Sequence, residues 1–132
     1  MAGDDRFRLA LDHFGRALGR LDDALARPED EFMRDAIIQR FEFTFEAGWR
    51  AMYRWLRGRG IDLDEDAFST LPEAFKRSVI TDAAAWGAMR KYRNLTSHTY
   101  NQALAVEVVA FVRGTGAAAL RAALEALEAQ TG

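Results

Sequence analysis

Two long stretches of this chain repeat their large apolar residues at alternating steps of three and four. The first set is Phe7, Leu11, Phe14, Leu18, Leu21 and Leu25, and the second is Ile38, Phe41, Phe45, Trp49, Met52 and Leu56. Side chains at this spacing share one face of an α-helix. The pattern therefore predicts two amphipathic helices. The first ends before Pro28, and the second extends from near Asp30 to Gly58 or Gly60.

A short third helix is predicted after an acidic loop. Thr70 and Glu73 have the spacing of a capping box, which predicts a helix that ends near Ile80. The three aspartates of residues 62–66, together with Glu73, also occupy positions one, three, five and twelve of a calcium-loop pattern. Ala67, however, stands where that loop makes a sharp turn that favours Gly. We therefore expect a solvated acidic loop and no metal site.

Two further helices are predicted towards the end of the chain. Asp82 is the expected N-cap of one helix, and Asn101 is the expected N-cap of the last, which is weakened at Gly114 and Gly116. Short connections join all the predicted helices. The expected fold class is therefore all-α, an antiparallel four-helix bundle with an additional short helix, formed by residues 1–132 as one domain.

Composition excludes several kinds of site. The chain has no Cys, which excludes thiolate catalysis, Cys-ligated zinc and iron–sulfur clusters and fits a reducing compartment. Its net charge of -2 excludes a general nucleic-acid-binding surface, so any contact with RNA must be local. No stretch approaches the ~18 apolar residues of a membrane span, and the first charged residues are acidic. We expect a cytoplasmic protein that binds no membrane and no cofactor.

Residues 93–100 form the segment in which a cation, an amide, an imidazole and a phenol lie closest together in sequence. If a helix continues through it, Asn94 and His98 share a face, whereas Arg93 and His98 diverge by about 140°. One helix cannot then direct both at the same phosphate. Either the helix ends between them or a second copy of the chain supplies the complement.

An arginine and a histidine suit RNA cleavage without a metal ion. A histidine takes or gives a proton near neutral pH, while an arginine balances the charge on the phosphate. In the alternative interpretation, the same side chains only cap a helix and anchor a loop, and spacing alone favours that role. The other histidine, His13, lies beside the first apolar stripe and is interpreted as a surface or boundary residue.

Phe43 extends the apolar surface of the second helix beyond one seam. It lies about 100° or more from the line of Phe41 and Phe45. This position indicates a partner surface, and we expect a homodimer. We also expect a hydrophobic, Arg-lined groove between the two copies, to which Arg90 and Arg93 contribute.

Two blocks of sequence resemble a known family. They are Gln39-Arg40-Phe41-Glu42-Phe43-Thr44-Phe45-Glu46 with Trp49, followed by Trp86, Met89 and Arg93-Asn94-Leu95-Thr96-Ser97-His98-Thr99-Tyr100. In this order they resemble the nucleotidyltransferase substrate-binding protein family, the HepT-like members of the HEPN superfamily, over roughly residues 38–109. The resemblance implies a HEPN-like helical bundle that dimerises and that is encoded beside a separate minimal nucleotidyltransferase.

Two functions follow from this resemblance. The HEPN pattern of Arg, four to six residues and His marks metal-independent ribonucleases, and here it corresponds to Arg93 and His98, with Asn94 in support. In HepT toxins of toxin–antitoxin pairs, the partner nucleotidyltransferase silences the toxin by attaching AMP to a Tyr two positions after the His, which corresponds to Tyr100. The alternative is a non-catalytic substrate-binding subunit of a two-component nucleotidyltransferase.

Some positions depart from the family pattern. Ala47 and Gly48 replace larger residues, so we expect thinner packing of the second helix and a cost of about 1 kcal/mol in helix propensity at Gly48. Pro72 falls inside the third helix, which we expect to start late or bend. Leu104 replaces an expected capping Thr, so the last helix is expected to cap at Asn101 instead. None of these positions is a candidate site residue.

Overall fold

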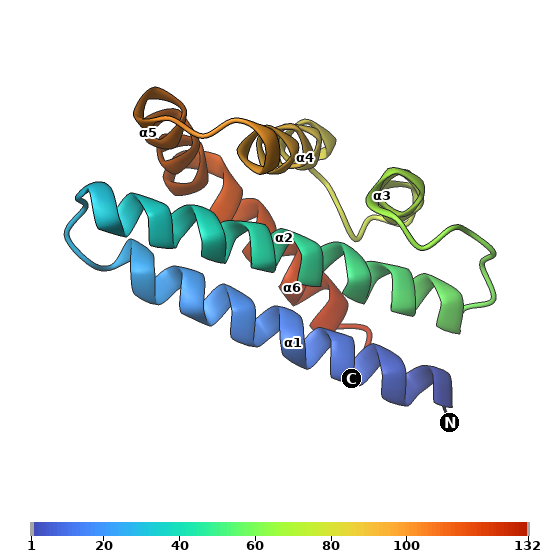
Figure 1. The fold of residues 1–132 in the computed structure, drawn as a ribbon. Helices are drawn as coiled ribbons and strands as arrows, with labels where there is room; N and C mark the ends of the chain where they lie inside the picture. The colour runs from blue at the N-terminus through green and yellow to red at the C-terminus, as the bar shows by residue number, and fades with distance from the viewer. Residues whose placement is uncertain (1, 132) are drawn as a thin grey trace.

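A computed structural model describes residues 2–131, and every regular element in that range is helical (Figure 1). The elements are α1 (Ala2–Leu25), α2 (Glu31–Gly58), α3 (Ala67–Lys76), α4 (Ala83–His98), α5 (Gln102–Phe111), the π-helical turn η1 (Val112–Gly116) and α6 (Ala117–Glu128). The segment from α5 to α6 is one continuous helix. The predicted all-α bundle with one short helix, α3, is confirmed.

The first two helices form the long antiparallel pair on which the rest of the chain packs (Figure 1). The predicted stripes are its buried contacts. Phe14, Leu18 and Leu21 of α1 are fully or almost fully buried, as are Phe41 and Phe45 of α2. Such burial of large side chains provides most of the stability of amphipathic helices. The predicted bounds of α2 are also confirmed.

The N-caps show where local sequence sets the helix starts. The Asp30 carboxylate accepts a hydrogen bond from Met33 N at 2.8 Å, Asp82 accepts one from Ala85 N at 2.9 Å, and Asn101 accepts one from Leu104 N at 2.9 Å. Each bond satisfies one N–H that has no partner within its helix. The predicted caps Asp82 and Asn101 are confirmed, and Asp30 caps α2 at its predicted start.

Helix α3 begins earlier than predicted, because its N-cap is Asp66. The Asp66 carboxylate accepts a hydrogen bond from Ser69 N at 2.6 Å, so the helix starts at residue 67 despite Pro72 inside it. The predicted capping box is wrong. Thr70 is fully buried within the helix, and Glu73 instead pairs with Arg77 at 2.5 Å. Asp66 belongs to the acidic loop and lies three residues before Ser69 N, and aspartate is one of the strongest N-cap residues.

Gly48 is the point at which three helices meet. A Cβ placed there would lie 3.1 Å from an aromatic carbon of Phe14 on α1 and 3.2 Å from one of Trp86 on α4. The absence of a side chain therefore lets both rings approach α2, and Trp86 also packs against Phe45 with 5.8 Å between ring centroids. The expectation that Gly48 thins the packing is wrong, because the two rings fill the space that a larger residue would occupy.

The last helix contains the predicted weak point. The five residues of η1 include Gly114 and Gly116 and form a π-helical turn, which interrupts the regular α-helical hydrogen bonds. By length and composition alone, the whole segment Gln102–Glu128 is long and apolar enough to cross a membrane. This corrects the expectation that the sequence contains no stretch of that kind. Here, however, it packs against α1 and α2, and Val108, Val112 and Leu120 are fully buried in the core.

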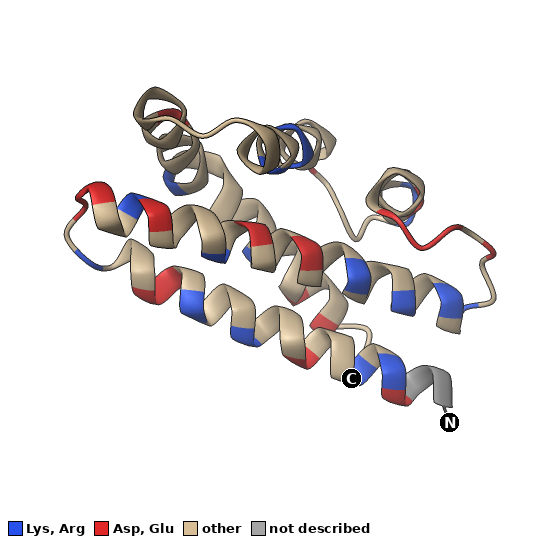
Figure 2. Ribbon diagram, viewed as in Figure 1, with Lys and Arg blue, Asp and Glu red and all other residues tan. Residues whose placement is uncertain are grey.

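The short helices α3 and α4 lie on the opposite side of α2 from α1. Figure 1 shows them nearly end-on while α2 runs across the view, so that they cross α2 steeply. Arginines gather along the C-terminal half of α2, next to the acidic loop (blue and red in Figure 2). The crossing brings the C-terminal half of α4, with most of the candidate site residues, over the middle of α2.

Candidate functional site

Helix α4 is continuous through both Arg93 and His98, so the alternative in which the helix ends between them is wrong. Asn94 and His98 are exposed on one side of the helix, as predicted from their spacing. They line a surface hollow of ≈ 380 Å³ together with Gly87, Arg90, Lys91 and Leu95. Within one chain, this hollow holds an imidazole, an amide and two cations, but not Arg93.

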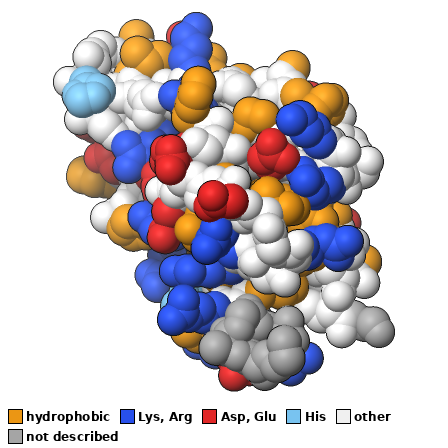
Figure 3. All heavy atoms as spheres, turned by 90° about the vertical axis from the view of Figure 1, so that its right-hand side faces the viewer, with side chains coloured by type: hydrophobic (Ala, Val, Ile, Leu, Met, Phe, Trp, Pro, Cys, Tyr) orange, Lys and Arg blue, Asp and Glu red, His pale blue; other side chains and the backbone are white. Residues whose placement is uncertain are grey.

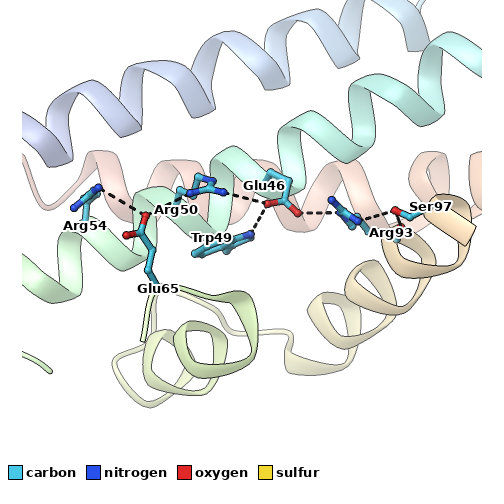
Figure 4. A network of polar contacts seen from close by, with 7 residues as sticks. All are labelled: Glu46, Trp49, Arg50, Arg54, Glu65, Arg93 and Ser97. Carbon is cyan, nitrogen blue, oxygen red and sulfur yellow. Dashed lines mark hydrogen bonds and ion pairs between the residues drawn. The ribbon is translucent and has the colours of Figure 1, made fainter. Parts of the chain in front are cut away.

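Arg93 lies on the side of α4 that faces α2 (Figure 4). Its Nε is 2.9 Å from Glu46 Oε1, and its Nη1 donates to Ser97 Oγ at 2.7 Å. Trp49 Nε1 donates to the other Glu46 oxygen at 3.0 Å, which fixes the carboxylate that holds the arginine. The Arg93 side chain remains one-third exposed. Arg93 is therefore a positioned guanidinium with one face open to solvent.

The Glu46 carboxylate belongs to a longer line of charges along α2. Arg50 is 4.0 Å from Glu46 and 3.4 Å from Glu65, and Arg54 is 3.7 Å from Glu65 (Figure 4). Exposed ion pairs of this kind contribute about 0–1 kcal/mol each to stability. Their main effect here is geometric, because they restrict the side chains on the Glu46 side of the Glu46–Arg93 pair.

A second carboxylate of α2 ties down the end of α4. Thr96 Oγ1 donates to Glu42 Oε2 at 2.6 Å and also lies 3.1 Å from the Arg93 carbonyl. Glu42 and Glu46 are four residues apart and therefore share a face of α2. Sequence reasoning did not assign a role to either glutamate. Their spacing was the available signal, but it did not reveal which helix would lie opposite.

Tyr100 follows α4 and contacts α2 rather than the hollow around His98. Its hydroxyl donates to Asp35 Oδ1, and its side chain is half-exposed. Partial burial, and then the hydrogen bond to the Asp35 carboxylate, raise the pKa of Tyr100 from 10.0 to about 12. The hydroxyl is therefore protonated, and acts as a donor, throughout the physiological range of pH.

Tyr100 does not lie beside Arg93 within one chain. Their partners Asp35 and Glu46 are eleven positions apart on α2, which corresponds to about 16 Å. The cation whose charge acts on the Tyr100 hydroxyl is Arg34. A group attached to Tyr100 would first meet Arg34 of the same chain.

Replacement of Asp35 by Asn should lower the pKa of Tyr100 from about 12 while leaving it above 10, because burial, the larger cause, remains. Tyrosinate absorbance, titrated with and without Tyr100→Phe, measures this change. Glu107→Gln is the matched control, because Glu107 accepts from Tyr92 and raises the pKa of that tyrosine instead.

The stability that Asp35 and Tyr100 contribute is present below pH 10 and lost as the pH rises to about 12. An unchanged Tyr100 titration in Asp35→Asn would contradict this assignment.

Phe43 lies outside the hollow around His98, whereas Arg90 lines it. Phe43 is 61% exposed on the open face of α2, and Phe32 on the same helix is 79% exposed, so the apolar extension is present as predicted. Arg90 is exposed, and its guanidinium lies 5.4 Å from the ring centroid of Phe68. His13 is exposed on α1, as predicted. Within one chain, the hollow thus brings together Arg90, Asn94 and His98, and it does not include Phe43, Arg93 or Tyr100.

Comparison with known proteins shows similarity to a family, to a curated protein and to solved structures. Residues 8–129 match a family described as "Nucleotidyltransferase substrate binding protein like". Over 77 residues the chain is 40% identical to a "Probable ribonuclease HepT" of Haemophilus influenzae, a match that covers 55% of this chain and about half (53%) of that relative's length. A crystal structure from Thermus thermophilus is 30% identical, with a TM-score of 0.76, over 86% of this chain and 98% of that chain.

Proposed function

The chain belongs to the nucleotidyltransferase substrate binding protein-like family, and on this premise we propose that it is a HepT-like, metal-independent ribonuclease of the cytoplasm. The observation that carries the proposal is the exposed segment of α4 with Arg90, Lys91, Asn94 and His98 around one hollow and Arg93 held beside it by Glu46. The similarity to a probable ribonuclease supports the same activity.

The proposed chemistry is proton transfer at a ribose. His98 takes the proton of the 2′-hydroxyl, whose oxygen then forms a bond to the neighbouring phosphorus as the bond from phosphorus to the 5′-oxygen breaks. The leaving 5′-oxygen takes up a proton from water, His98 returns its proton to the solvent, and Arg93 stabilises the negative charge that develops on the phosphate. Asn94 lies on the same side of α4 as His98 and is placed to donate to a phosphate oxygen.

The direct test is the wild-type protein with single-stranded RNA in the presence of EDTA. Cleavage under these conditions supports the proposal, because the residues assigned to the chemistry need no metal. The alternative, a substrate-binding subunit of a nucleotidyltransferase, is favoured by the description of the family. Absence of cleavage by pure protein, together with tight binding to a nucleotidyltransferase, would replace the ribonuclease proposal with this alternative.

The active site is proposed to form across a homodimer. On a continuous α4, Arg93 faces α2 whereas His98 faces the hollow, so the two converge on one phosphate only if each chain supplies one of them. Arg-lined and apolar surfaces, including Phe43, would lie between the two copies. The second copy would then cover the face of α2 that carries the exposed side chains of Phe32 and Phe43.

Light scattering at micromolar concentration should report a dimer for the wild-type protein. Phe43→Asp should shift the population towards monomer, because it places a charge in the apolar contact. The matched control is Val106→Asp, which changes a half-exposed apolar residue on α5, away from the open face of α2. A monomeric wild-type protein, or equal effects of the two variants, would contradict the proposed dimer.

Control by a separate nucleotidyltransferase is proposed to act through Tyr100, as in a toxin–antitoxin pair. The Tyr100 oxygen attacks the α-phosphorus of a nucleoside triphosphate bound to the partner, pyrophosphate leaves, and Asp35 takes the hydroxyl proton. The half-exposed hydroxyl and its hydrogen bond to Asp35 support this role. The attached AMP adds a bulky, negatively charged group close to Arg34.

Co-expression with the nucleotidyltransferase should therefore add one AMP to Tyr100 and reduce RNA cleavage without unfolding the protein. Intact-mass and peptide mass spectrometry locate the adduct, which should be absent in Tyr100→Phe. Tyr92→Phe is the matched control, because Tyr92 also donates to a carboxylate, that of Glu107 at 2.7 Å. Adducts only at other residues, or none with an active partner, would contradict this mode of control.

A further inference from the structure

A groove between α3 and α4 has no role in the chemistry described above. Its volume is ≈ 380 Å³, and its lining is almost entirely apolar, with a single cation. The side chains that define it are Phe68, Leu71 and Phe75 of α3, Ile80 of the following loop, and Trp86 and Arg90 of α4. A groove of this size and composition is typical of sites for small, flat apolar groups.

The two phenylalanines at the mouth of the groove are exposed to an unusual degree. Phe68 is 71% exposed and Phe75 is 49% exposed. Figure 3, which faces the end of the molecule where α3 lies, shows exposed hydrophobic side chains interspersed with Lys and Arg. Exposed aromatic rings next to cations are the usual platform on which the bases of single-stranded nucleic acids stack.

The groove is continuous with the hollow around His98. Gly87 and Arg90 line both of them. From Arg90 to His98 the distance along α4 is eight residues, or about 12 Å. A single strand that crosses Arg90 can therefore place one nucleotide in the apolar groove and an adjoining nucleotide at His98.

Arg90 and Lys91 differ from Arg93, whose guanidinium is paired with Glu46. Among residues 5–131, no carboxylate lies within ion-pair distance of either side chain, and Arg90 instead contacts the face of Phe68. An apolar side chain of a protein partner would fill the groove but leave these two charges unmatched. A nucleotide satisfies both features, because its base is flat and its phosphate is anionic.

We propose that the α3–α4 groove is a base-binding subsite for single-stranded RNA, in which a base stacks on Phe68 and Arg90 binds the phosphate that leads to His98. This inference rests on the proposed ribonuclease function. The subsite adds to that function by selecting unpaired RNA, since a base within a duplex cannot enter the groove. In this subsite Arg90 positions the RNA strand.

The test is the affinity of the full-length protein for a fluorescent single-stranded RNA, measured by anisotropy in a His98→Ala background so that the probe stays intact. Phe68→Ala should weaken binding by about 10-fold or more, because one stacked base is lost. Val106→Ala is the control, since Val106 is a half-exposed apolar residue on α5, outside both the groove and the open face of α2. Arg90→Ala should weaken binding and reduce its dependence on salt by about one phosphate contact.

A second probe separates stacking from a general structural effect. The probes are a series of oligonucleotides that each lack one base at a different position. The oligonucleotide that lacks the stacked base should bind Phe68→Ala and the parent protein equally well. Equal effects of Phe68→Ala and Val106→Ala on RNA binding would overturn the subsite. So would a Phe68→Ala variant that binds RNA normally and loses only its binding to the nucleotidyltransferase. RNA binding that depends on Phe68 in a protein that does not cleave RNA would instead overturn the ribonuclease function and retain the subsite.

Discussion

Replacement of His98 by Ala should lower the rate of RNA cleavage by about 10²- to 10⁴-fold, which is the usual contribution of a general acid–base group. The imidazole is exposed at the end of α4 and lines the hollow that also holds Arg90, Lys91 and Asn94. Its removal takes no side chain from the hydrophobic core. The loss of activity should therefore occur with an unchanged thermal unfolding midpoint.

The chain offers a matched control for this experiment. It contains only two histidines, and His13 is also exposed but lies on α1, outside the hollow. His13→Ala should retain full activity under the same conditions. Persistent cleavage by the His98 variant at the wild-type rate would show that another group carries out the proton transfer or that a contaminating nuclease is being measured.

A mixture of two inactive variants should recover activity. Arg93→Ala and His98→Ala are each expected to be inactive, because each lacks one member of the pair. If Arg93 of one chain acts with His98 of the other, a mixed dimer contains one intact site and one site that lacks both residues. Random exchange should then restore about a quarter of the wild-type activity, since half of the dimers are mixed and each carries one site of two.

The mixing experiment distinguishes a shared site from two independent sites. If both residues acted within one chain, every site in a mixed dimer would lack one of them, and mixing would restore nothing. The double variant that carries both substitutions, mixed with wild-type protein, controls for simple dilution. Failure to regain activity under conditions in which light scattering shows exchange would rule out the shared site.

Much of the fold could be predicted from the sequence because the relevant signals are local. The apolar stripes of α1 and α2 repeat within one or two turns, and the caps Asp82 and Asn101 act on a backbone N–H three residues away. The divergence of Arg93 and His98 also follows from helical geometry alone. Errors arose where two local signals competed, as at α3, where Asp66 rather than Thr70 caps the helix.

The sequence by itself determined the helices, their caps and the candidate residues on α4, because residues a few positions apart specify these features. Only the tertiary structure decided what those residues contact. Thr96 meets Glu42, 54 positions away, and Tyr100 meets Asp35, 65 positions away. Such pairs depend on how α4 crosses α2, and Trp86 of α4 packs closely against Gly48 of α2. No local pattern encodes this crossing, because the packing of side chains from distant segments sets the angle between helices.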